Sequence, residues 1–370
     1  MKIKDIKSRK VLNSAAKYTI ETTVILEDGS TGVASIPGGL SKGATEVATV
    51  EPDKAVKNVL KLEHELTSRV FNDVHELDKF LIEKDGTDNK SNLGGNTILS
   101  ISIAFTKAKA KSEGKETYEY IAELAGNTHK FRWPKMMMLM LEGGLHGSSD
   151  ATIQEFMAIV DSIDRGVEIY NKIKDELKKL GKSTNVGAEG AFSPDGYDND
   201  QTLSLLSGFL HGEQIAIDVA ASSFENKNVM PDYETLLKNY PIASIEDPYD
   251  EKDWTNWELF GEKYTEKIIV VTDDITTTNP KLLQMAIEKD IGNAILVKPN
   301  QIGSVSETLE VIRMAHNAGW QVVVSHRGTD TNDDFIADLA VGSGAEFTKF
   351  GSPARGERIA KYNRLLGILE

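Results

Sequence analysis

The chain has 370 residues, of which 40% are hydrophobic and 27% are charged, and its formal net charge is −15. Such an acidic chain argues against non-specific binding to nucleic acid or to an anionic membrane, although a site can still be locally positive for an anionic small substrate. The absence of cysteine excludes disulfides, thiolate metal sites and cysteine nucleophiles. With no apolar signal segment at the N-terminus and no apolar run of ~20 residues, we expect a cytoplasmic protein.

The first part of the chain mixes strand and helix patterns. Residues 17–36 predict two strands joined by a turn at Asp28–Gly29, which is a typical hairpin signal. The glycine-rich stretch at 38–44 predicts a flexible loop. From residue 51 to 84 the apolar spacing is helical.

Two further helices close this part of the chain. One is predicted over residues 96–114 and the other over residues 116–126, and each ends at a glycine. The segment 127–135 then breaks the pattern. We therefore predict a smaller α+β N-terminal domain over residues 1–127 and a second domain over residues 128–370.

The second part repeats one unit, in which a short apolar run ends in polar or charged residues and a helical stretch follows. The step of about 25 residues fits one strand, one helix and two short loops. Repeated units of this kind predict an α/β fold in which a (β/α)8 barrel carries its active site at the carboxyl ends of the strands. The residues at these ends are Asp218, Glu246 with Asp247, Asp273 with Asp274, Lys298, His326 with Arg327, and Lys349.

Three of these strand ends bring carboxylates together. Asp218, Glu246 and Asp273 come from consecutive predicted strands. Converging carboxylates repel one another, and their proton affinity rises unless a cation neutralises them. Oxygen ligands without cysteine indicate a hard divalent ion, Mg²⁺ before Ca²⁺ or Mn²⁺. The alternative is a structural set of salt bridges to the lysines of the same ring.

The remaining strand ends are basic. We expect the pKa of Lys298 to fall beside a metal ion and a second lysine, Lys349, so that it can act as a base near neutral pH. Arg327 suits bidentate binding of a phosphate or carboxylate. A base and a metal ion that stabilises an enediolate are what removal of a proton α to a carboxylate requires; enolase-superfamily sites are a known example of this pairing.

Polar residues also occur in two unusual settings between the domains' regular elements. His146 lies in a glycine-rich loop, and Glu155 begins an apolar run. Glu189 stands between Ala188 and Gly190, whose small size allows close approach of a ligand. A lone His or Glu in such a loop is as often structural as functional.

Specific motifs along nearly the whole chain resemble the enolase family. They include "NKSNLGGNTILSISIA", "HGSSDATIQEFM", "NVGAEGAFSPD", "SIEDPYDEKDW", "LVKPNQIGSVSETL" and "VVVSHRGTDTNDDFIADLAVG". The resemblance implies an enolase-type barrel with an irregular start, preceded by a smaller domain. It also implies a glycolytic lyase, phosphopyruvate hydratase, which converts 2-phosphoglycerate to phosphoenolpyruvate, and a homo-oligomer, either a dimer or a larger ring.

The resemblance further implies roles for matching residues. Lys298 is similar to the base that removes the C2 proton, and Glu189, with Glu155 beside it, to the acid that helps hydroxide leave C3. Two Mg²⁺ ions are expected, the second arriving with substrate and reached by Ser41 of the mobile loop. The first is implied to be bound by Asp218, Glu246 and Asp273. Substrate is implied to be held by His146, Glu155, Lys298, His326, Arg327 and Lys349.

The chain departs from the family pattern near these residues. The family has aspartate at Ala188, serine at Gly328, threonine at Lys42 and glutamate at Ser223. These changes keep two alternatives open. One is a Mg²⁺-dependent lyase or isomerase acting on another α-proton carboxylic acid, and the other is a non-catalytic paralogue with a binding role.

Overall fold

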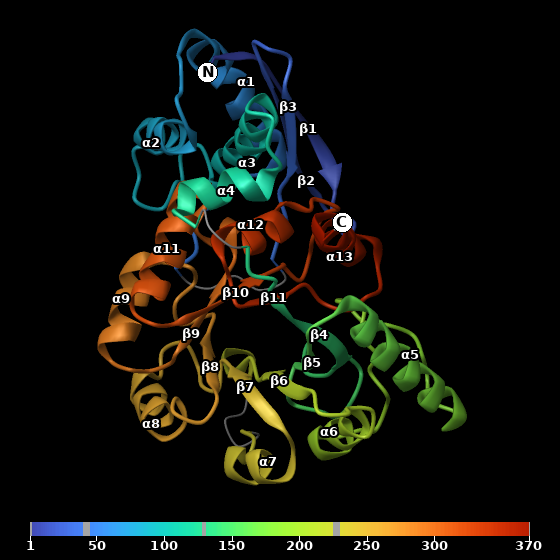
Figure 1. Ribbon diagram of the computed structural model, residues 1–370. Coiled ribbons are helices and arrows are strands. Elements are labelled where there is room, and N and C mark those ends of the chain that lie inside the picture. Colours follow the sequence, from blue (N-terminus) through green and yellow to red (C-terminus); the bar gives the residue numbers. More distant parts are fainter. Residues whose placement is uncertain (1, 40–44, 128–130, 225–229, 370) are drawn as a thin grey trace.

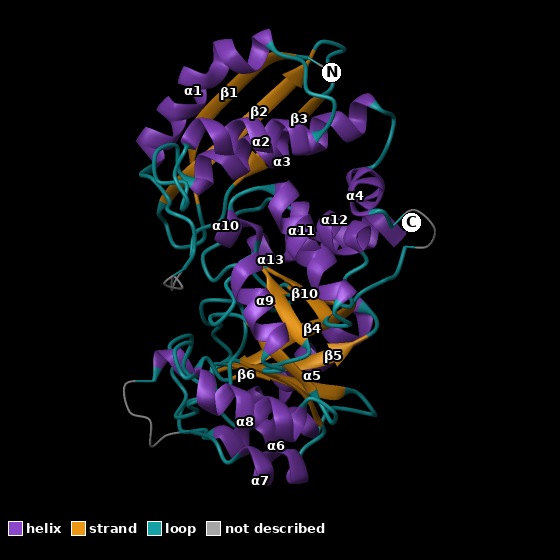
Figure 2. Ribbon diagram, turned by 90° about the vertical axis from the view of Figure 1, so that its left-hand side faces the viewer, coloured by secondary structure: helices purple, strands orange, loops and turns teal. Residues whose placement is uncertain are grey.

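The computed structural model describes residues 2–39, 45–127, 131–224 and 230–369, so Ser41 and Lys42 lie outside the described residues. Figures 1 and 2 show an N-terminal sheet with helices stacked above a barrel. The sheet has the order β1 (Ile3–Leu12), β2 (Tyr18–Leu26), β3 (Thr31–Ser35), and both pairs are antiparallel. The predicted hairpin at Asp28–Gly29 is confirmed.

Four helices follow this sheet and lead to the barrel. They are α1 (Pro52–Ser68), α2 (Val74–Asp85), α3 (Gly95–Ser112) and α4 (Thr117–Ala125). The helical spacing predicted over residues 51–84 is borne out as two helices, because Asp73 starts a new helix by accepting a hydrogen bond from the Glu76 amide. The helix α3 packs closely on the sheet, since a Cβ on Gly32 would lie 2.0 Å from the carbonyl oxygen of Ala104.

The second part is a closed barrel of eight strands, as predicted. Its strands are β4 (Lys135–Glu142), β5 (Glu155–Val160), β6 (Gln214–Asp218), β7 (Ile242–Glu246), β8 (Ile269–Thr272), β9 (Ala294–Val297), β10 (Gln321–Ser325) and β11 (Phe347–Lys349). The barrel starts irregularly, because β5 runs antiparallel to both β4 and β6, whereas the later pairs are parallel. The parallel half therefore brings the ends of β6 to β11 to one mouth.

Helices surround the barrel. They are α5 (Ile163–Lys179), α6 (Asn199–Ser207), the short 3₁₀ helix η1 (Ala221–Ser223), α7 (Tyr233–Asn239), α8 (Trp254–Tyr264), α9 (Pro280–Glu288), α10 (Pro299–Ile302), α11 (Val305–Asn317), α12 (Phe335–Ser343) and α13 (Gly356–Leu369). Burial of apolar side chains between strands and helices is the main stabilising term. None of the helices in the described part of the chain is long and apolar enough to cross a membrane.

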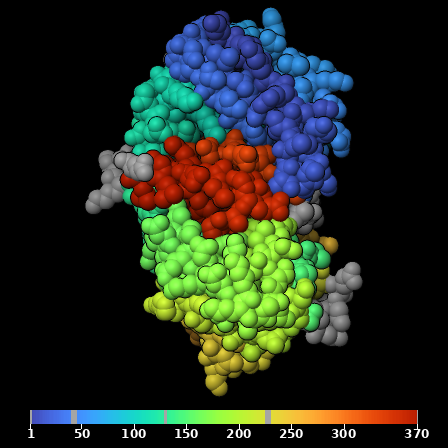
Figure 3. All heavy atoms as spheres, turned by 90° about the vertical axis from the view of Figure 1, so that its right-hand side faces the viewer, coloured from blue at the N-terminus to red at the C-terminus, as the bar shows by residue number. Residues whose placement is uncertain are grey.

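The C-terminal segment joins the two parts. Figure 3 shows the red C-terminal residues as a band between the blue N-terminal region and the green start of the barrel. Arg355 donates to the Ser14 carbonyl oxygen at 3.3 Å, and Arg364 lies 2.7 Å from Glu116. The predicted boundary between residues 127 and 128 stays a prediction, because residues 128–130 are not described.

Candidate active site

A pocket of ≈470 Å³ opens at the mouth of the barrel. It is lined by nine of the residues predicted to be functional: His146, Glu155, Glu189, Asp218, Asp273, Lys298, His326, Arg327 and Lys349. The tenth, Glu246, reaches the same site through its contact with Lys349. The irregular start of the barrel contributes Glu155 and the loops that hold His146 and Glu189, and the parallel strands contribute the rest.

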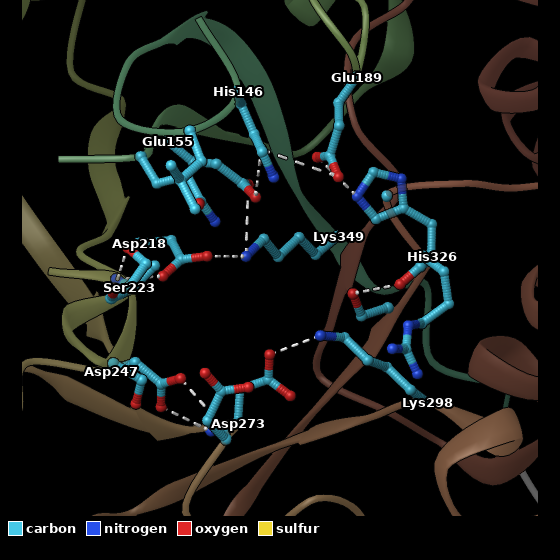
Figure 4. Close-up of a pocket in the computed structure, with 18 of the residues that line it drawn as sticks. His146, Glu155, Glu189, Asp218, Ser223, Asp247, Asp273, Lys298, His326 and Lys349 are labelled. Atoms are coloured by element: carbon cyan, nitrogen blue, oxygen red, sulfur yellow. Dashed lines mark hydrogen bonds and ion pairs between the residues drawn. The ribbon is translucent and has the colours of Figure 1, made fainter. Parts of the chain in front are cut away.

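Lys349 lies at the centre of the site, between the groups shown in Figure 4. Its Nζ donates to Glu246 at 2.7 Å and to Asp218 at 3.0 Å, and it lies 3.3 Å from Glu155. Burial and the nearby Asp218 raise the pKa of Glu246 well above its usual value, although Lys349 acts in the opposite direction. The salt bridges that the sequence left open as an alternative are therefore present.

Lys298 forms the second ion pair of the pocket. Its Nζ lies 2.5 Å from Asp273 Oδ2, and Gln301 donates to the other oxygen of Asp273 at 3.3 Å. Burial lowers the pKa of Lys298, but attraction by Asp273 outweighs burial and the nearby Arg327, so the pKa is raised. The lowered pKa was expected for a lysine beside a metal ion, so it stays a prediction, whereas in this arrangement the nearest charge is the Asp273 carboxylate.

Two acids beside the predicted ligands were not assigned a role from the sequence. Asp247 follows Glu246, Asp274 follows Asp273, and both line the pocket. Asp247 accepts the backbone N–H groups of Asp273 and Asp274, each at 3.0 Å, and has a positive φ of 45°. Burial and Asp274 raise its pKa well above the usual value. Strained backbone of this kind is concentrated at functional sites.

The potential ligands for a cation therefore fall into more than one set. In the described part of the chain, Asp247, Asp273 and Asp274 form one compact group, and His146, Glu155 and Glu189 form another. The predicted trio of Asp218, Glu246 and Asp273 is not among these compact groups. Its members face the lysines instead.

Glu189 is held by two histidines. His326 Nε2 lies 3.1 Å from Glu189 Oε2, and His146 Nδ1 lies 4.0 Å from Oε1. Burial alone would raise the pKa of Glu189, but His326 and His146 lower it well below its usual value. Burial lowers the pKa of His326 to about 4, so at neutral pH the pair is a carboxylate beside an uncharged imidazole.

The tautomer of His326 follows from a residue that the sequence did not single out. Arg358 is fully buried, and its Nη1 lies 2.8 Å from His326 Nδ1. Because a guanidinium can only donate, Nδ1 must accept, and the ring proton of the neutral histidine lies on Nε2, toward Glu189. Arg358 also donates to the carbonyl oxygens of Arg327 and Gly328, at 2.5 and 2.6 Å.

The loop that carries Glu189 is fixed through its backbone. Tyr170 of α5 donates to the Gly190 carbonyl at 2.8 Å, Arg355 to the Gly187 carbonyl at 3.2 Å, and the Ser352 amide to the Glu189 carbonyl at 3.1 Å. These contacts come from three separate segments, so no local sequence pattern would reveal them. They make the position of Glu189 a property of the whole fold.

Arg327 is engaged by the N-terminal part of the chain. Its two terminal nitrogens each lie 3.0 Å from a carboxylate oxygen of Glu46, and Nη1 also donates to Asn300 at 3.0 Å. Glu46 was not singled out from the sequence, because it is separated from Arg327 by 281 positions. Its position just after the glycine-rich loop at 38–44 could have indicated from the sequence that Glu46 lies near the site.

The site belongs to a recognisable class, that of barrel enzymes in which a buried lysine, a buried glutamate and a cluster of other acidic side chains surround one pocket. Comparison with known sequences narrows this class. The family model described as "Enolase, N-terminal domain" matches residues 3–121, and "Enolase, C-terminal TIM barrel domain" matches residues 130–232 and 225–370. An enolase of Legionella pneumophila (strain Lens) is 40% identical over 412 residues, which covers 100% of this chain and 97% of that protein. The chain belongs to the enolase family and is a lyase.

Proposed function

We propose that the protein catalyses the Mg²⁺-dependent dehydration of 2-phosphoglycerate to phosphoenolpyruvate. The observation that supports this most is that one pocket holds a partly buried lysine, Lys298, and a buried carboxylate, Glu189, with eight further carboxylates and four further basic side chains around them. Removal of a proton from one carbon and of hydroxide from the next needs a base and an acid on the same substrate. The finer assignments below belong to this proposal.

Lys298 is proposed to take the C2 proton. It must be uncharged to do so, and Asp273 now favours its charged form. A cation bound to Asp273 would remove this attraction and lower the proton affinity of Lys298. In this proposal the base becomes competent only when the carboxylates are otherwise occupied, which links metal binding to basicity.

Asp218, Glu246 and Asp273 are proposed to hold the first Mg²⁺, with Asp247 and Asp274 close by. The fit rests on the donor set, which is entirely oxygen, and on Glu246 Oε1, which is buried and has no hydrogen-bond partner. When bound, Mg²⁺ would stabilise the enediolate charge that forms as the C2 proton leaves. A second Mg²⁺, reached by Ser41, is part of the proposal.

Glu189 is proposed to give a proton to the C3 hydroxyl, so that the C–O bond breaks and water leaves. Since His326 and His146 lower its pKa, Glu189 must gain proton affinity in the substrate complex. An anionic substrate beside it has this effect by like-charge repulsion. Glu155 is proposed to assist it.

Arg327, with His326 and Lys349, is proposed to bind the anionic groups of the substrate. This is supported by the contact of Arg327 with Glu46, in which the guanidinium binds a carboxylate bidentately. A homo-oligomeric assembly in the cytoplasm, with residues 1–127 and 128–370 as its two domains, completes the proposal.

Turnover of 2-phosphoglycerate with added Mg²⁺ tests this function, followed by the ultraviolet absorbance of the enol product. We expect turnover by the wild type and a loss of roughly 10²–10⁴-fold in Lys298→Ala, the usual contribution of a general base. Equal turnover by both proteins would refute Lys298 as the base. No turnover by a folded wild type that binds Mg²⁺ would favour another α-proton acid as substrate, and a panel of hydroxy acids would identify it.

A further inference from the structure

Glu142, at the end of β4, is a buried carboxyl group that the mechanism above does not use. Its side chain is 0% exposed, and neither of its carboxyl oxygens has a hydrogen-bond partner. The ionised form of a carboxyl group in this setting is strongly disfavoured. A group of this kind, so close to a catalytic centre, calls for a functional explanation.

The side chain lies directly against the loop that carries Glu189. A Cβ added to Gly187 would lie 1.6 Å from Glu142 Oε1 and 2.6 Å from its Cδ. The position before Glu189 is Ala188, whose side chain carries no polar group. Across the strand pair, Glu142 is in register with Glu155, the other acid of this side of the pocket.

The charges around Glu142 come from four elements. The carboxylate of Glu189 repels its ionised form, whereas Arg358, Arg355 and the backbone amide of Glu189 attract it. Tyr170 of α5 faces it as a neutral phenol, because burial raises the pKa of Tyr170. Burial and Glu189 together raise the pKa of Glu142 to about 8.

We propose that Glu142 is a positioning residue for Glu189, which works as a neutral carboxylic acid packed against Gly187. This inference rests on the proposed function of Glu189. In the neutral form Glu142 fills the space behind the loop without adding a second negative charge beside Glu189. When Glu142 ionises, a buried carboxylate without a partner has to be accommodated, and the loop must shift to solvate it.

The consequence is an alkaline limit to activity. Turnover should fall as the pH rises through about 8, where Glu142 loses its proton. Glu142→Gln keeps the size of the side chain and its capacity to donate and accept hydrogen bonds, but it cannot ionise. Glu142→Ala removes the packing as well, which leaves a cavity behind the loop.

The experiment compares kcat against pH for the wild type, Glu142→Gln and Glu142→Ala, with Asp78→Asn as a matched control. Asp78 is also fully buried with a raised pKa, but it lies on α2, outside the pocket. We expect Glu142→Gln to keep kcat within about threefold at pH 7 and to lose the alkaline fall. Glu142→Ala should be roughly 10–100-fold slower at every pH, in line with losses on removing supporting groups in metal sites, and Asp78→Asn should keep the wild-type pH profile.

Three results would overturn the inference. The first is an unchanged alkaline fall in Glu142→Gln, and the second is a Glu142→Gln protein that is folded but inactive, since that would require an ionisable acid. The third is the absence, in the infrared spectrum at pH 7, of a protonated-carboxyl band that disappears in Glu142→Gln. Failure of the proposed function is distinguished by the wild type itself, which would then not turn over 2-phosphoglycerate at any pH.

Discussion

The two sides of the pocket satisfy their buried polar atoms in different ways. On the side of β6 to β9, Asp273 lies 2.5 Å from Lys298, and Asp218 and Glu246 lie 3.0 and 2.7 Å from Lys349 of β11, with Glu246 Oε1 left without a hydrogen-bond partner. On the side of β4 and the loop at Glu189, buried atoms of Glu142 and His146 have no hydrogen-bond partner. In the proposed function, the first side exchanges charges with an incoming ion, whereas the second controls protons.

Removal of divalent ions should have the largest effect on turnover, because it acts directly on the side of the pocket where carboxylates face lysines. We expect a chelator to abolish turnover of 2-phosphoglycerate and added Mg²⁺ to restore it, since the enediolate then loses and regains its stabilising charge. Turnover that persists in full after dialysis against a chelator would show that the lysines alone supply the positive charge.

Replacement of Lys349 separates the salt bridges from the ion site. Lys349→Met should destabilise the metal-free protein by roughly 3–5 kcal/mol, because buried carboxylates lose their countercharge. Mg²⁺ should recover part of this loss in urea unfolding, since it neutralises the same carboxylates.

Lys107→Met is the control for this experiment, because Lys107 is partly buried and also pairs with two carboxylates, those of Asp333 and Asp334, but lies outside the pocket. Its stability should not respond to Mg²⁺. An equal response of both variants would mean that the ion acts elsewhere.

The side of the pocket formed by β4 and the Glu189 loop should be sensitive to a larger side chain at Gly187. Gly187→Ala is expected to lower kcat about 10²-fold, because the new Cβ displaces Glu142 and with it the loop of Glu189. Gly367→Ala, where a Cβ meets nothing within 4 Å, should leave kcat unchanged. Wild-type kcat in a folded Gly187→Ala protein would show that the loop tolerates displacement.

The smallest effect on turnover is expected far from both sides, at Asp78. Burial raises its pKa to about 7, so the folded protein keeps a proton there that the unfolded chain releases above its usual pKa of about 3.9. Stability should therefore fall between pH 4 and 7, and Asp78→Asn should remove this slope while activity stays constant. Urea unfolding at several pH values measures the slope, and parallel curves for both proteins would contradict the assignment.

Much of the fold could be predicted because charged residues follow short apolar runs at a regular step. This step located the ends of β6 to β11 and the residues that line the pocket. The spacing of about 25 residues did not predict the antiparallel start of the barrel, because β4 and β5 are joined by a loop without a helix. The strand β1 was missed because its buried Ile3 and Ile6 are separated by charged residues.

The interactions within the site could not be predicted to the same degree. Which lysine faces which carboxylate depends on side-chain directions that spacing does not encode, so the sequence could not reveal that Asp273, and after it Glu246, raise the pKa of Lys298. Arg358 and Glu142 act through neighbours in space rather than in sequence. Asp247 and Asp274 were visible as acids beside predicted ligands, but nothing in the sequence gave them a separate role.

The contact between Glu46 and Arg327 has a consequence for the energetics of substrate capture. In the proposed function, a phosphate that binds this guanidinium would displace the Glu46 carboxylate, whose oxygens already lie 3.0 Å from it. Substrate binding would thus exchange one anion for another at Arg327, and the arginine would stay paired with a negative charge throughout. The free energy needed to remove water from Arg327 is then already spent when the protein folds. The observed affinity for phosphate therefore reflects how much better the arginine binds phosphate than it binds the Glu46 carboxylate.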